Sequence, residues 1–198
     1  MQKQKVSIEF IFGDKNSNLS KDINSFWRAI NKSYEEEMQS HRQATLITQN
    51  EKRFLEPGKI TTLKREPAAL AKDQDGSILG IILVALTKIE SSSNSNEYVY
   101  FQRMYTKTPD RHFSLSNQLY TSFLRSFRKA INKRDSRAHF LMAENANPRL
   151  RTPSMRRYFF RLGFRMLGTN HLGYEIWRLP LETNDDTEIT SIKVKSTE

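Results

Sequence analysis

The chain has 198 residues, a formal net charge of +10 and 37% hydrophobic residues, which suits one α/β domain that buries its own core. It contains no cysteine, which excludes a disulfide framework, a cysteine-based zinc site and a thiol nucleophile. The longest apolar run, Ile78 to Leu86, is about half of what a membrane-spanning helix needs, and the N-terminus lacks the apolar core of a signal peptide. We therefore expect a cytoplasmic protein with one domain over residues 1–182, neither inserted in a membrane nor exported.

The positive charge is concentrated in one segment. Between Arg125 and Arg165 there are twelve Lys and Arg residues but only two acidic ones, so this segment carries the whole net charge. A focused basic surface attracts anionic partners, which here are nucleic acid, an acidic protein or a phosphorylated cofactor. The alternative is an arginine-rich helix surface that is merely solvated.

The first third of the chain predicts a strand followed by a helix. Val6 to Phe12 alternates enough for a strand, and Asn18 to Met38 carries apolar residues at helical spacing. Gln39 to Lys59 is polar and irregular with a turn at Pro57 and Gly58, so it is either a loop or a short helix followed by a loop.

The middle of the chain predicts a β-hairpin and then another strand. Thr61 to Ala71 and Ile78 to Thr87 flank an Asp75-Gly76 dipeptide, which is typical of a tight turn between two strands. Ser91 to Asn96 is a loop by composition, and Glu97 to Tyr105 is rich in the aromatic and β-branched residues that favour a strand.

The last third predicts a helix, a strand and a second helix before two final strands. Apolar residues recur every four positions from Leu115 to Phe127, which indicates an amphipathic helix ending near Ile131. Arg137 to Ala143 predicts a strand. Thr152 and Pro153 resemble an N-cap and the first helical position, and Gly163 is placed to end that helix.

The end of the chain completes the predicted domain. We expect its last two strands over Arg165 to Gly168 and Gly173 to Leu179. Beyond Leu181 the sequence turns polar, which predicts a disordered tail over residues 183–198.

Two motifs and this order of elements give the chain a resemblance to a known family. The segment from Glu97 to Leu119 predicts strand, polar loop and helix, and Leu162-Gly163-Phe164 follows about forty residues later. Over roughly Ile60 to Leu181 the chain resembles the GNAT superfamily of acyl-CoA N-acyltransferases. The resemblance implies an α/β (α+β) fold with a mixed, mostly antiparallel central sheet flanked by helices.

The first motif occupies the place of the family's cofactor loop, Gln/Arg-x-x-Gly-x-Gly/Ala. In such a loop backbone N–H groups and a helix N-terminus bind a pyrophosphate, and the glycines allow a close approach. Here the loop is Arg111 to Ser116, and both glycine positions are serine. The alternative is that Ser114 or Ser116 only caps the helix. The resemblance implies cofactor contacts from Met104, Tyr105, Arg111, His112, Phe113, Ser114, Leu115, Ser116 and, after the next strand, Asn147. Asn145 also follows that strand, where the family commonly places a polar residue against the cofactor arm.

The second motif resembles the family's Tyr-x-x-x-Gly-Phe signature, whose tyrosine often protonates the leaving thiolate. That tyrosine would fall at Phe159, which cannot donate a proton, so Tyr158 beside it is the candidate acid. For the general base the resemblance suggests a carboxylate on the fourth strand, Glu97, with Glu144 after the next strand as its rival. Each of these residues could instead be structural or solvated.

Two functions compete at this point. The first is an acyl-CoA-dependent N-acyltransferase that transfers an acyl group, expected to be acetyl, to an amine of an unidentified acceptor, which could be a nucleic acid or a protein. The second is a catalytically degenerate GNAT-like module that binds nucleic acid or an acidic partner. An open gap between the fourth and fifth strands, with unpaired N–H groups from Ser114 to Ser116, favours the enzyme, and a filled gap favours the module. The module's anion-binding residues would be Arg125, Arg128, Arg149, Arg151, Arg156, Arg157 and Arg161.

Other chemistry is not indicated. The four histidines show no pairing at metal-ligand spacing, so we expect no metal site. A different α/β domain remains the third alternative, because each motif is short.

Overall fold

The computed structural model describes residues 6–14, 17–46, 59–90, 96–107 and 110–182, and the backbone alone for residues 17, 18, 41–46 and 59. The predicted turn at Pro57 and Gly58, residues 91–95 of the predicted serine-rich loop and the predicted polar tail lie outside these ranges. In the described part of the chain, no helix is long and apolar enough to cross a membrane.

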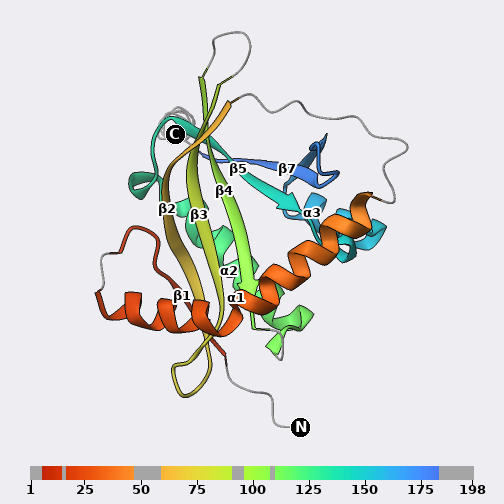
Figure 1. The fold of residues 1–198 in the computed structure, drawn as a ribbon. Helices are drawn as coiled ribbons and strands as arrows, with labels where there is room; N and C mark the ends of the chain where they lie inside the picture. The colour runs from red at the N-terminus through yellow and green to blue at the C-terminus, as the bar shows by residue number, and fades with distance from the viewer. Residues whose placement is uncertain (1–5, 15–16, 47–58, 91–95, 108–109, 183–198) are drawn as a thin grey trace.

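A seven-stranded sheet forms the centre of the molecule (Figure 1). Its strand order is β1-β2-β3-β4-β5-β7-β6, and every neighbouring pair is antiparallel except β4 and β5, which are parallel. This arrangement confirms the predicted mixed, mostly antiparallel sheet flanked by helices. The strands are β1 (Ser7–Phe10), β2 (Lys59–Lys72), β3 (Ile78–Glu90), β4 (Asn96–Thr106), β5 (Ala138–Asn145), β6 (Arg165–Thr169) and β7 (Glu175–Pro180).

Helices cover both faces of the sheet, and Figure 1 shows α1 in front of it and α2 behind it. The helix α1 packs Phe26 and Ile30 against Leu70 and Ile81, whereas α2 packs into a separate core cluster on the opposite face. Both clusters follow from the alternation of side chains along each strand. The helices are α1 (Ser17–Leu46), α2 (Phe113–Lys129) and α3 (Pro153–Arg161), with 3₁₀ turns η3 (Ile131–Lys133) and η4 (Pro148–Arg151).

The helix α1 is longer than the sequence pattern predicted. It continues to Leu46, so the first part of the polar segment that begins at Gln39 is helical, as in the second of the two alternatives for that segment. Residues 39–46 contain no Gly or Pro to end a helix, and polar residues such as Gln and Arg are good helix formers.

The hairpin between β2 and β3 forms as predicted. Asp73 Oδ1 accepts hydrogen bonds from the backbone N–H groups of Asp75 (3.0 Å) and Ser77 (2.8 Å). Gly76 has a φ of 82°, a conformation that side chains with a Cβ rarely adopt. The Asp-Gly signal therefore reflects a backbone requirement of the turn.

The parallel strands β4 and β5 separate part-way along their length. Their pairing runs from Tyr98 with Ala138 to Gln102 with Ala143. Beyond that point β4 pairs only with β3, and the last two residues of β5 pair only with β7. The sheet therefore opens between the C-terminal ends of β4 and β5, and this opening positions the candidate site.

Candidate functional site

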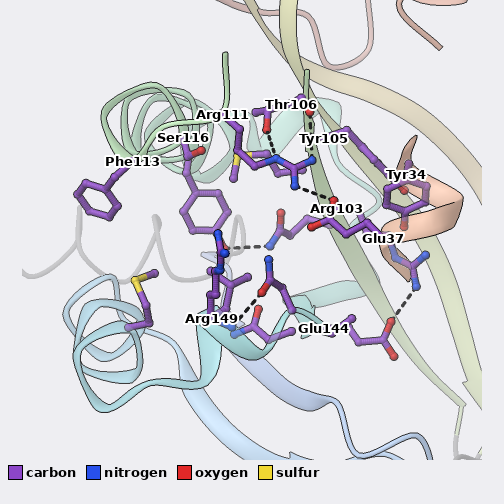
Figure 2. A pocket seen from close by; sticks show the side chains of 18 of the residues that line it. Tyr34, Glu37, Arg103, Tyr105, Thr106, Arg111, Phe113, Ser116, Glu144 and Arg149 are labelled. Carbon is purple, nitrogen blue, oxygen red and sulfur yellow. Dashed lines mark hydrogen bonds and ion pairs between the residues drawn. The ribbon is translucent and has the colours of Figure 1, made fainter. Parts of the chain in front are cut away.

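A cavity of about 800 Å³ lies where β4 and β5 separate (Figure 2). Residues from both faces of the sheet line it, because α1 contributes Tyr34 and Glu37 while α2 and α3 contribute Tyr120 and Tyr158. The gap between the strands is thus open rather than filled by side chains. Its lining also includes Gln102 to Thr106 of β4, Arg111 to Phe113, Ser116 and Asn117, and Glu144 to Asn147 with Arg149.

Two buried polar atoms with no partner lie at this opening. Gln102 of β4 is 8% exposed and Asn145 of β5 is 3% exposed, and both line the cavity. The Gln102 Nε2 donates to the Tyr120 hydroxyl at 3.0 Å, but Gln102 Oε1 and Asn145 Nδ2 have no hydrogen-bond partner among the described residues. Buried polar atoms are nearly always satisfied, so an unpaired acceptor and an unpaired donor on the two separating strands call for a partner such as water or a ligand.

The start of α2 is neither a loop with free N–H groups from Ser114 to Ser116 nor a helix capped by one of these serines. The N-cap is His112, whose Nδ1 accepts from the Leu115 N–H at 3.1 Å, and whose carbonyl accepts from the Ser116 N–H at 3.2 Å. The N–H groups of Leu115 and Ser116 are thus paired, so this part of the criterion for the enzyme is not met, and the alternative of a serine cap is contradicted by His112. The N–H groups of Phe113 and Ser114 are the first two of the helix, where no carbonyl of the preceding turn is available.

Of the loop residues, Arg111, His112, Phe113 and Ser116 line the cavity, whereas Leu115 is buried in the core and Ser114 is not among the lining residues. Met104 and Tyr105 of β4 and Asn147 after β5 line it as well. Asn147 also begins η4, since its Oδ1 accepts from the Arg149 N–H at 2.9 Å.

Arg111 is committed to neighbouring protein groups. Its Nη1 bonds Glu37 Oε2 at 2.6 Å, its Nε donates to Thr106 Oγ1 at 3.2 Å and its Nη2 donates to the Thr106 carbonyl at 3.3 Å (Figure 2). The guanidinium predicted to contact phosphate therefore joins α1 to the end of β4. No sequence pattern indicated Glu37 as its partner, because 74 positions separate the two residues.

Tyr158 and Phe159, the two residues at the place of the family's proton-donating tyrosine, lie on different sides of α3. Phe159 is buried and stacks on Trp177 with a centroid distance of 5.3 Å, so it belongs to the core. Tyr158 lines the cavity, and its hydroxyl donates to Asn117 Oδ1 at 2.8 Å. Partial burial raises the pKa of Tyr158, and Arg161 offsets part of that rise. Tyr158 is thus a protonated hydroxyl at the cavity wall.

The two candidate carboxylates are in different places. Glu144 lines the cavity, where its Oε2 accepts from Arg103 Nη2 at 2.7 Å and its Oε1 from Asn170 Nδ2 at 2.6 Å. Glu97 lies at the other end of β4, exposed and 3.9 Å from Arg178. It is six residues from Arg103, a separation of roughly 20 Å along a strand, so the structure does not bring Glu97 to the cavity.

The α1 side of the cavity contains residues that the sequence pattern did not single out as a site. Tyr34 and Trp27 of α1 pack edge-on against Tyr105 of β4, with centroid distances of 4.9 and 4.7 Å. Burial, followed by the neighbouring Tyr105, raises the pKa of Tyr34 to about 12. Their helical spacing in the sequence indicated an inward helix face, but only the fold shows that part of this face meets a cavity.

The arginines predicted to bind anions have three different environments. Only Arg149 lines the cavity. Arg128 and Arg151 donate to the carbonyls of Leu162 and Gly173, and Arg156 binds the buried carboxylate of Glu175. The remaining three are exposed: Arg125, Arg157 and Arg161. Within the described ranges, no group of three His, Asp or Glu side chains could hold a metal ion.

Comparison with known proteins gives likenesses only at the level of structure. No protein-family model matches the chain, and no curated protein matches it. A GNAT superfamily phosphinothricin acetyltransferase from Sinorhizobium meliloti, solved in complex with AcCoA, is 14% identical with a TM-score of 0.49, and the match covers 91% of each chain.

Two further solved structures are also described as acetyltransferases. A putative acetyltransferase from Acinetobacter baylyi is 13% identical with a TM-score of 0.45, covering 93% of this chain and 96% of that one. An aminoglycoside N(6')acetyltransferase from Legionella pneumophila is 11% identical with a TM-score of 0.39, covering 95% and 98%. Since these TM-scores are all below 0.5, the function proposed below rests on the residues of this chain.

Proposed function

We propose that the protein is an acyl-CoA-dependent N-acyltransferase of the GNAT type, which transfers an acetyl group to an amine. The observation that carries the proposal is the open gap between β4 and β5, with Gln102 Oε1 and Asn145 Nδ2 buried and unpaired on its two sides. A secondary amide has one N–H donor and one carbonyl acceptor, which is the complement of this pair. The pantetheine arm of coenzyme A contains such amides.

The residues around the gap also suit the rest of an acyl-CoA. The N-terminus of α2 lies at the cavity wall, where Phe113 supplies a first-turn N–H that no carbonyl of the preceding turn can accept, and Arg149 adds a positive charge there. When bound, the cofactor supplies an acyl group already activated as a thioester. An open gap of this kind is what distinguishes the enzyme from the degenerate module, although the N–H groups of Leu115 and Ser116 are occupied by His112.

Two side chains of the cavity have the properties required for handling protons. Tyr158 keeps its proton at neutral pH because burial raises its pKa, so its hydroxyl is the candidate general acid. Glu144, held by Arg103 and Asn170, is the carboxylate that an acceptor amine entering from the α1 side would meet. Glu144 therefore replaces Glu97 as the candidate that orients and deprotonates the amine.

The test is thermal unfolding of the protein with and without acetyl-CoA. At a ligand concentration one hundred times the dissociation constant, binding should add about 2.7 kcal/mol of stability. For a chain of this size that corresponds to a rise in Tm of about 5–10 °C. Asn145→Leu should abolish the rise by removing the unpaired donor. It should leave the free protein at least as stable, because an unsatisfied buried polar group costs roughly 1–3 kcal/mol.

Transfer itself can be followed by the release of free coenzyme A with a thiol reagent. The protein contains no cysteine, so the reagent would report only the product. Primary amines that accelerate the release in the wild-type protein and not in Tyr158→Phe would identify acceptors. An absence of any Tm rise at millimolar acetyl-CoA would contradict the proposal and favour the non-catalytic module.

A further inference from the structure

The helices on one side of the molecule carry no acidic residue. Residues 111–134, which include α2, and residues 145–174, which include η4 and α3, contain no Asp or Glu, whereas each segment has six Lys or Arg residues. The helix α1 on the opposite face has both signs of charge in its sequence. The absence of acids is therefore a property of one face and not of the protein's helices in general.

Three of the four acidic residues that border these segments are already neutralised. Asp135 binds Arg137 at 2.8 Å, Glu144 binds Arg103 at 2.7 Å, and Glu175 is 1% exposed and binds Arg156. None of these three is available to balance the exposed cations of α2 and α3, and the fourth, Asp110, precedes the N-terminus of α2, at the opposite end of that helix from Lys129. The field of these cations therefore extends into solvent.

Four exposed cations on α2 and α3 have no acidic partner among the described residues. They form two pairs at i,i+4 spacing, Arg125 with Lys129 on α2 and Arg157 with Arg161 on α3. Like charges at this spacing destabilise a helix. Lys129 and Arg161 lie in the last turn, where the helix dipole favours a cation, but Arg125 and Arg157 lie before it and lack that explanation.

The two helices present these cations on the same side of the molecule. Both pack into the core cluster on one face of the sheet, through Phe123 of α2 and Phe159 of α3. They also contact each other, since Arg128 Nη2 donates to the Leu162 carbonyl at 3.0 Å and Tyr158 donates to Asn117. Their exposed surfaces thus turn away from the sheet together.

An exposed aromatic ring lies next to the cations. Phe160 of α3 is 47% exposed, and the Arg165 guanidinium lies 5.8 Å from its ring centroid. Arginine clusters interleaved with exposed aromatic rings suit a strand whose phosphates need cations and whose bases can stack. A purely acidic peptide would make use of the cations but not of the ring.

We propose that the α2–α3 face, defined by Arg125, Lys129, Arg157, Phe160 and Arg161, binds single-stranded nucleic acid. The cations contact the phosphate backbone, and Phe160 stacks on a base. None of the five residues lines the cavity, so this binding does not depend on the acyltransferase proposal.

The test is binding of a fluorescently labelled 20-nucleotide RNA by the full chain, measured by anisotropy at several salt concentrations. Arg157→Gln/Arg161→Gln should weaken binding several-fold and lower the slope of log K against log salt by about 1.4, the effect of losing two single-strand phosphate contacts. The matched control is Arg28→Gln/Lys32→Gln, which removes an exposed i,i+4 cation pair from α1. It should change the affinity less than twofold.

Two further measurements separate this surface from other anion sites. A duplex of the same sequence and poly-glutamate should both bind more weakly than the single strand, and Phe160→Leu should reduce that preference. Excess coenzyme A should leave RNA binding unchanged. The proposal is overturned if RNA does not bind at 50 mM salt, if both double variants lose affinity equally, if poly-glutamate binds as tightly as RNA, or if coenzyme A displaces the RNA.

Discussion

Arginine lines the cavity at both ends, but it is paired with a carboxylate at one end and has no acidic partner among the described residues at the other. On the α1 side, Arg103 and Arg111 line the cavity and each is bound to a carboxylate, Glu144 and Glu37. On the α2–α3 side, Arg149 lines the cavity with no acidic partner among the described residues. The first end is a set of fixed ion pairs, and the second end retains its positive charge.

This contrast shows that the count of arginines says little about where an anion binds. A guanidinium paired with a carboxylate contributes almost no net field, whereas an unpaired one attracts anions over several ångströms. We therefore expect an anionic cofactor to approach from the α2–α3 side and an amine from the α1 side. Substitutions of paired and unpaired arginines, and of the groups around them, test this difference.

The largest effect is expected where the carboxylate of an ion pair is buried. Arg156→Gln leaves the Glu175 carboxylate, 1% exposed, without its cation, which should cost about 3 kcal/mol of stability. The neighbouring Arg157→Gln should change stability by less than about 0.5 kcal/mol because that side chain is exposed and unpaired. Urea unfolding measures both, and Arg156→Gln/Glu175→Gln should recover part of the loss. Equal costs at positions 156 and 157 would contradict the assignment.

The next effect concerns ligand affinity. Arg149→Gln should weaken acetyl-CoA binding about tenfold, the cost of one charge-assisted hydrogen bond. Arg103→Gln is the matched control, since Arg103 lines the same cavity but its charge is balanced by Glu144. Titration calorimetry should show a clearly smaller loss for the control. If Arg103→Gln weakens acetyl-CoA binding more than Arg149→Gln does, the anion approaches from the α1 side, contrary to the expectation above.

A smaller effect is expected from the ion pair that joins α1 to Arg111. Glu37→Gln removes a partly exposed pair, so its cost should be no more than about 1 kcal/mol and should shrink as salt is added. Thermal unfolding at low and high salt measures this. A loss that is independent of salt would show that Glu37 stabilises α1 by packing instead.

The smallest effect is a pH dependence on the α1 side. The pKa of Tyr34 is raised to about 12 in the folded protein, so the folded state holds this proton more tightly than the unfolded state does. The resulting stability is fully present below about pH 10 and is lost as the pH rises toward 12. Tyr34→Phe should therefore show a shallower decline in urea-unfolding free energy between pH 10 and pH 12. An unchanged decline would mean that Tyr34 ionises as it does in the unfolded chain.

Periodicity and turn chemistry predicted most of the elements because their causes are local. The alternation in β3, the four-residue spacing in α2, the Asp-Gly turn and the Thr152-Pro153 helix start all depend on neighbours within a few positions. For residues 39–46 the sequence left a loop and a helix open, and the structure shows a helix; at the start of α2 the cap is His112, which the sequence reasoning did not single out for that role.

The candidate site was only partly predictable from the sequence. Tyr158, Glu144 and Ser116 were anticipated and do line the cavity, while Glu97 was anticipated and lies outside it. Gln102 and Asn145 are candidate ligand-binding residues because each has a buried, unpaired polar atom on one of two strands that separate. No local sequence pattern predicts that combination of burial and strand separation.

The sequence by itself determined the elements, the absence of thiol chemistry and the segment that carries the net charge, because these depend on residue type and short-range spacing. Only the tertiary structure decided which charges are neutralised and which hydroxyl meets the cavity. Arg111 and Glu37 are 74 positions apart, and Tyr158 and Phe159 differ by one helical step. Partner choice and the direction of a side chain are set by the packing of distant segments, which a one-dimensional pattern does not contain.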